Sequence, residues 1–238
     1  MRRVRQGPSL PQATEGSPMP ARPRIVLLHA TPVAIEPIQA SFATKWPEAE
    51  LVNLLDDSLS VDRQKDHDLT PAMIERFVAF GTYAYRIGAD AILATCSAFG
   101  PAIEQVGREM PVPVLKPNEA MFRAALEKGS RIGMLTTFAP SVVTMSEEFD
   151  AFVREAGKEA TMRTIVVDRA MDALRKGDAK THNELVAARA PELADCDAIM
   201  LAQFSTSRAL PAVGAAVTAP VLTAPDAAVD RLKVVLGA

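Results

Sequence analysis

The sequence predicts an α/β protein of two pseudo-symmetric halves, each a mainly parallel sheet flanked by helices, with a cleft between them. Two observations lead to this fold class. From Arg24 onward, short apolar runs alternate with longer segments of helical period, a pattern typical of parallel strands joined by crossover helices. The chain also repeats itself, because the residues from Arg24 align with those from Arg131.

Strands are predicted wherever an apolar run is short and rich in Val, Ile and Leu. These runs are RIVLLHA (24–30), AELVNLL (49–55), AILATC (91–96), VPVLKP (112–117), RIGMLTT (131–137), ATMRTIVV (160–167), AIMLAQ (198–203) and APVLTA (219–224). Apolar residues at helical spacing mark buried helix faces over residues 74–84 and 142–152. Residues 54–70 are polar and predict a long loop, either a cover for the cleft or a solvated connection.

The internal repeat sets the expected domain boundaries. DAILATCSAFGPAIEQVG, from Asp90, aligns without a gap on DAIMLAQFSTSRALPAVG, from Asp197. We expect a first half at residues 24–123, completed by the C-terminal segment, and a second half at residues 124–238. Residues 1–23 are proline-rich and predict a disordered tail, in which both Met1 and Met19 are candidate translation starts.

Composition restricts the classes of partner. The net charge of -3, with both signs interleaved, gives no basic patch for nucleic acid or an anionic membrane. No apolar run reaches the roughly 18 residues of a membrane span, and two cysteines are too few for a disulfide framework. We therefore expect a cytoplasmic protein with a small-molecule partner and no nucleic-acid or membrane partner; a homodimer is the commonest soluble assembly.

Cofactor motifs are missing from the sequence. There is no GxGxxG after a strand, no GxxxxGK[ST] loop, no HExxH and no paired CxxC. The sequence therefore contains none of the usual motifs for binding a nucleotide, zinc or an iron-sulfur cluster. It predicts no cofactor and no metal site.

Cys96 is the first candidate for chemistry because it stands where a predicted strand ends and a turn of small residues begins. Backbone N–H groups that open the next helix would lower the pKa of its thiol and favour the thiolate, both a base and a nucleophile. The alternative is an inert, buried thiol that acts as a small hydrophobe. Cys196 stands at the start of its strand, where the inert interpretation is favoured.

Small hydroxyl side chains gather at the same predicted strand ends. They are Thr31, Thr95, Ser97, Thr136, Thr137, Ser205 and Thr206. Hydroxyls and helix N-terminal amides can hold a carboxylate, although each hydroxyl could instead cap a helix. His29 ends the first strand and could serve as an acid or base near neutral pH, or as a hydrogen-bonded structural residue.

The duplicated layout, the cysteine of ILATCSAFG, the strand RIGMLTT and the PVL strands before PNEAM and APDAA together carry a resemblance. With these features the chain resembles the aspartate/glutamate racemase superfamily, which also includes hydantoin racemases, maleate cis-trans isomerases and arylmalonate decarboxylases. The resemblance implies a cofactor-independent enzyme with a catalytic cysteine in each half. It implies that Cys96 is the first of these and that Ser97 and Thr137 bind the substrate carboxylate.

The second cysteine implied by the resemblance is missing, since Gln203 stands at the position that aligns with Cys96. A glutamine amide has no accessible pKa for taking a proton. Isomerisation by one thiol on a small carboxylic acid, with Thr31, Ser97, Thr137, Gln203 and Ser205 as substrate-binding residues, is the leading hypothesis. The alternatives are decarboxylation with protonation from one side by Cys96, racemisation with His29 as the second base, and a non-catalytic acid-binding protein.

Overall fold

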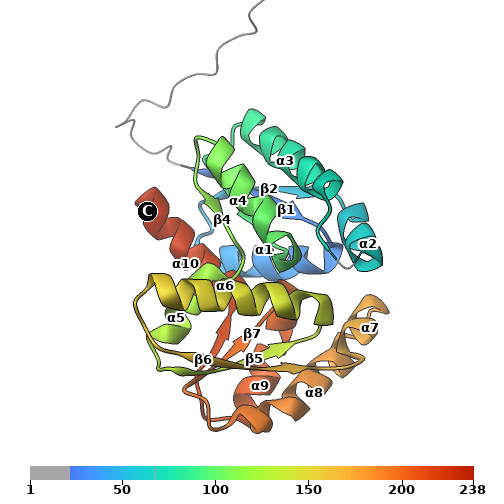
Figure 1. Cartoon of the computed structure of the whole chain (residues 1–238), viewed down its shortest axis with the longest axis vertical. Coiled ribbons are helices and arrows are strands. Elements are labelled where there is room, and N and C mark those ends of the chain that lie inside the picture. The colour runs from blue at the N-terminus through green and yellow to red at the C-terminus, as the bar shows by residue number, and fades with distance from the viewer. Residues whose placement is uncertain (1–21, 67) are drawn as a thin grey trace, which may run out of the picture.

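The computed structural model describes residues 22–66 and 68–238, so the predicted tail lies almost entirely outside the described residues. Figure 1 shows two α/β layers stacked on one another, the first half in blue and green and the second in yellow to red. Within the described residues, no helix combines the length and apolar character that crossing a membrane requires.

The strands form two four-stranded parallel sheets of identical topology. The first has the order β2-β1-β3-β4 and the second the order β6-β5-β7-β8. The strands are β1 (Arg24–His29), β2 (Glu50–Leu55), β3 (Ala91–Ala94), β4 (Val114–Leu115), β5 (Arg131–Thr136), β6 (Thr161–Val166), β7 (Ala198–Leu201) and β8 (Val221–Thr223). All of the predicted strands are present, and the predicted fold class is confirmed.

Helices flank both sheets, as expected of right-handed crossovers between parallel strands. They are α1 (Ile35–Lys45), α2 (Ser58–Lys65), α3 (Pro71–Arg86), α4 (Gly100–Glu109), α5 (Glu119–Leu126), α6 (Val142–Glu155), α7 (Ala170–Arg175), α8 (Ala179–Arg189), α9 (Leu210–Ala216) and α10 (Ala224–Leu236). The apolar faces predicted on α3 and α6 are buried at Phe77, Ala84, Met145 and Phe149.

The prediction of one long loop over residues 54–70 is wrong, because this segment contains α2. The helix is polar, and Leu59 is the fully buried apolar side chain that anchors it. Such a helix has almost no apolar periodicity, so the sequence offered little signal for it.

The last helix of each half packs against the other half. In Figure 1, α10 lies beside α1, and Lys45 of α1 pairs with Asp230 of α10 at 2.9 Å. In the same way α5 lies against α6, where the rings of Phe122 and Phe149 meet edge to face. One apolar core therefore joins the two sheets, and this continuous core holds the strand ends of both halves in a fixed relation. The exact domain boundaries stay a prediction.

Candidate functional site

A cleft lies where segments that follow the strands of both sheets meet, and it encloses about 580 Å³ of empty space, part of it open to solvent. Its lining residues follow β1, β3, β4, β5 and β7 or belong to α2 and α7. They are Thr31, Val33, Ala34, Ser60, Gln64, Thr95, Cys96, Ser97, Pro117, Asn118, Phe138, Met171, Arg175, Ala202, Gln203, Phe204 and Ser205. This is the edge where open parallel sheets place their ligands.

Cys96 lies in this cleft just after β3, on extended backbone before the short helix of Ser97–Phe99. Burial raises the pKa of its thiol, and the backbone N–H of Ala98 and the charge of Arg63 act in the opposite direction without reversing the shift. The pKa of Cys96 is therefore raised, and the lowering expected from its place before a helix is wrong. The reason is that the site removes water from the sulfur more effectively than one N–H and one nearby cation compensate.

Four of the predicted hydroxyls line the cleft together with Cys96. The Thr95 hydroxyl is bonded to the His29 ring, and the other three belong to Thr31, Ser97 and Ser205. Thr31 precedes the turn of Pro32–Ala34, yet its side chain makes no capping hydrogen bond. None of the three hydroxyls has a hydrogen-bond partner within residues 22–66 and 68–238. Helix capping is therefore not their role, and their O–H groups are available to a ligand.

Gln203 also lines the cleft, but its side-chain amide is fully occupied by the protein. Nε2 donates to the Thr136 hydroxyl at 2.6 Å and to the Ser141 hydroxyl at 2.9 Å. Oε1 accepts from the backbone N–H of Thr137 at 2.9 Å and from the Thr206 hydroxyl at 3.1 Å. Both amide protons are used, so Gln203 ties the end of β5 to the end of β7 and has no donor left for a substrate.

The structure does not bring Thr137 or His29 into the cleft lining. The Thr137 side chain is buried against Gln203 and the Thr206 hydroxyl. Its position explains how a threonine at this strand end supports the site: it holds Gln203 in place. Direct contact of Thr137 with a substrate finds no support in this geometry.

His29 is fully buried behind the cleft and is bonded through both ring nitrogens. Nδ1 lies 2.8 Å from the Thr95 hydroxyl, and Nε2 lies 3.0 Å from Asn53 Oδ1. Burial lowers the pKa of His29, which keeps the ring neutral near pH 7. Both ring nitrogens of His29 therefore face protein partners, and neither is directed at a substrate.

Several lining residues were not predicted from the sequence. Asn118 follows β4 and is fully buried, and the rule that polar residues at strand ends mark the site would have found it. Ser60 and Gln64 come from α2, and Arg175 comes from α7. Neither helix was expected, so these three residues carried no signal in the sequence.

Asn118 connects the cleft to a buried carboxyl group outside it. Asn118 Nδ2 lies 3.5 Å from Oε2 of Glu148 on α6, and Asn118 Oδ1 is buried without a hydrogen-bond partner among the described residues. Burial raises the pKa of Glu148 to about 7, although Lys116 and Asn118 act against the shift. Gly100 leaves the space for this carboxyl, since a Cβ there would lie 2.5 Å from Glu148 Oε1.

The raised pKa of Glu148 predicts a pH-dependent loss of stability. A carboxyl group with a higher pKa in the folded than in the unfolded chain stabilises the fold below its unfolded pKa, and this contribution is lost as the pH rises through the folded value. For Glu148 the window runs from 4.5 to about 7. The free energy of unfolding should fall across it by on the order of 2–3 kcal/mol from this group alone.

Urea unfolding of Glu148→Gln and of the parent at pH 5 and pH 8 measures this contribution. The variant should lose much less stability than the parent between the two pH values. Glu147→Gln changes the neighbouring residue on α6, which is less buried, and should follow the parent. An equal loss of stability in Glu148→Gln and the parent would contradict the assignment.

The chain is similar in sequence to one known protein family and in fold to several solved structures. The family model described as Asp/Glu/Hydantoin racemase matches residues 9–166, more than half of the chain. No curated protein matches the chain by sequence.

Three solved structures illustrate the similarity. Glutamate racemase RacE1 from Bacillus anthracis is 13% identical with a TM-score of 0.70, covering 91% of this chain and 82% of its own. Picrophilus torridus aspartate racemase is 14% identical with a TM-score of 0.67, covering 90% and 94%. A mutant of arylmalonate decarboxylase is 20% identical with a TM-score of 0.63, covering 90% and 94%. At these identities the likeness shows the shared fold.

Proposed function

This chain belongs to the Asp/Glu/hydantoin racemase family, and on that premise we propose that it is a cofactor-independent isomerase that uses the single thiol of Cys96 on a small carboxylic acid. The substrate is of the amino-acid or dicarboxylate type. The observation that carries the proposal is the position of Cys96 in a cleft beside three hydroxyls without partners among the described residues.

Binding of the substrate carboxylate is the task of these hydroxyls. Thr31 and Ser97 come from the first half and Ser205 from the second, so a bound carboxylate would be held from both sides of the cleft. Neutral donors stabilise an anion without a full positive charge, which would strongly stabilise the bound substrate before it reacts. The same donors can then stabilise the enolate oxygen that develops during the reaction.

One thiol is sufficient for cis-trans isomerisation by addition and elimination. The Cys96 thiol first loses its proton to water, and the thiolate then adds to one carbon of an activated double bond while the electron pair moves onto the carboxylate as an enolate. Rotation about the resulting single bond precedes cleavage of the carbon–sulfur bond, which re-forms the double bond and releases the thiolate. The Ala98 N–H and the Arg63 charge stabilise the thiolate in this sequence.

Racemisation requires a base on each face of a planar carbanion, and the described residues of the cleft offer no second base. Gln203 replaces the second cysteine and is engaged in protein hydrogen bonds, while His29 is buried with both nitrogens bonded. The proposal therefore favours reactions that use Cys96 from one side.

A decarboxylase is the second candidate, favoured by the raised pKa of Cys96. A thiol that is neutral at rest is suited to giving a proton to an enolate after carbon dioxide has left. Protonation from Cys96 alone would reach one face of the enolate and would yield one enantiomer.

The test is incubation of the full chain in heavy water with a panel of unsaturated dicarboxylates, α-substituted malonates and α-amino acids. Addition and elimination should interconvert cis and trans isomers without deuterium in the product. Decarboxylation should release carbon dioxide and leave one deuterated enantiomer. If no compound reacts, the enzyme proposal fails in favour of the non-catalytic acid-binding protein.

A further inference from the structure

The charge of the cleft restricts the substrate more narrowly than the fold does. Among the described residues that line the cleft, Arg175 is the only charged one, and none is an aspartate or glutamate. A second cation acts from the first half, because the charge of Arg63 lowers the pKa of Cys96 against the effect of burial. The described lining of the cleft therefore carries positive charge, from Arg175, and no negative charge.

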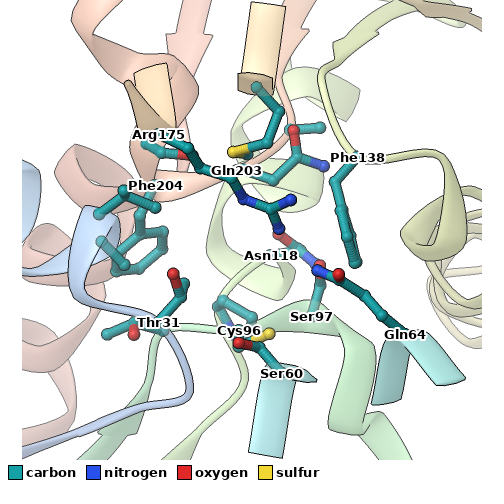
Figure 2. Close-up of a pocket in the computed structure, with 17 residues that line it drawn as sticks. Thr31, Ser60, Gln64, Cys96, Ser97, Asn118, Phe138, Arg175, Gln203 and Phe204 are labelled. Carbon is teal, nitrogen blue, oxygen red and sulfur yellow. The ribbon is translucent and has the colours of Figure 1, made fainter. Parts of the chain in front are cut away.

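Arg175 is held at the cleft by α7. Leu174, the residue before it, is buried and anchors this short helix, while Arg175 itself is exposed. Figure 2 shows its side chain reaching from the second half into the cleft between Gln203 and Cys96. Within the part of the chain that the structure describes, the Arg175 guanidinium has no ion-pair or hydrogen-bond partner.

An unpaired guanidinium in a cleft whose described lining contains no acidic residue matches an anion. Its planar fork of N–H donors fits both oxygens of a carboxylate at once. The hydroxyls of Thr31, Ser97 and Ser205 are available for one carboxylate, and Arg175 offers a separate, charged site for another.

The same charge pattern disfavours an α-ammonium group. An ammonium in this cleft would find no carboxylate among the described lining residues, and the charge of the Arg175 guanidinium would repel it. The buried carboxyl of Glu148 lies behind Asn118 and does not line the cleft.

We propose, building on the proposed function, that the substrate is a small dicarboxylic acid without an α-ammonium group and that Arg175 binds its second carboxylate. Arg175 is thus a specificity-determining residue. Within the described residues, the Arg175 guanidinium has no partner. The described lining of the cleft offers available hydroxyls and contains no acidic side chain.

Calorimetric titration at constant ionic strength tests this assignment with malonate, succinate and glutarate, with butyrate, and with both enantiomers of aspartate. Succinate, butyrate and aspartate share a four-carbon chain and differ in the second carboxylate and the ammonium. The best dicarboxylate should bind the parent at least about tenfold more tightly than butyrate or aspartate, as expected for one charged hydrogen-bonded pair.

Arg175→Gln should weaken binding of that dicarboxylate about tenfold or more and leave binding of butyrate unchanged. Lys176→Gln removes the neighbouring exposed cation outside the cleft lining and should bind like the parent. Thermal unfolding of both variants checks that the fold is intact.

Equal dicarboxylate affinity in Arg175→Gln and the parent would overturn the assignment. So would aspartate binding as tightly as succinate, or no measurable binding of any probe. These measurements do not read turnover. Dicarboxylates that bind through Arg175 but never react would count against the proposed isomerase alone, and a reaction that is indifferent to Arg175 would count against this inference alone.

Discussion

Cys96→Ala is expected to lower turnover of whichever substrate reacts by about 100- to 10,000-fold, because acid-base catalysis by one group typically contributes this much. Among the described residues that line the cleft, Cys96 is the only thiol, and none is a histidine, an aspartate, a glutamate or a lysine. The measurement is the steady-state rate at saturating substrate.

Two further variants distinguish catalysis from packing. Cys96→Ser preserves the size of the side chain but has a hydroxyl whose pKa is far above that of a thiol, so it should be nearly as inactive as the alanine variant. Cys196→Ala removes the other cysteine, which lies before β7 and outside the cleft lining, and should keep the parent rate. A Cys96→Ala variant that reacts as fast as the parent would rule out the thiol mechanism.

Gln203→Ala is expected to lower the free energy of unfolding by about 2–4 kcal/mol, because buried polar groups left without partners each cost about 1–3 kcal/mol. The backbone N–H of Thr137 and the hydroxyls of Thr136 and Ser141 lose the amide that joins them. Urea unfolding at fixed pH measures this change.

Gln64→Ala is the matched control, since Gln64 also lines the cleft and is an exposed glutamine of α2 without a hydrogen-bond partner within the described residues. It should change the unfolding free energy by no more than about 0.5 kcal/mol, as surface substitutions usually do. Similar small effects in both glutamine variants would mean that the Gln203 network does not stabilise the fold.

The two glutamine variants also bear on what replaced the second cysteine. At the position that aligns with Cys96, the chain carries an amide that joins β5 to β7. The second half therefore supplies the hydrogen-bonded amide of Gln203 and the hydroxyl of Ser205, while the thiol comes from the first half. This asymmetry is the reason why one-sided chemistry is proposed.

Much of the fold was predictable because it depends on local patterns. Parallel strands buried on both faces have continuous apolar runs, and a gapless internal repeat extends the pattern of one half to the other. The alignment of the two repeats is also sufficient to assign Cys96 and Gln203 to equivalent strand ends. Polar, short helices such as α2 and α7 have no comparable periodicity, and they were missed together with the cleft residues that they carry.

The sequence by itself determined the fold class, the duplication and the presence of one cysteine at a strand end of the cleft. Only the tertiary structure decided the state of that thiol, the engagement of Gln203, the burial of His29 and the approach of Arg175. The physical reason is that periodicity reports which face of an element is buried, whereas a pKa or a free hydrogen-bond donor depends on neighbours that are distant in the chain. Burial of Cys96 outweighs the local N–H groups that its sequence position suggested.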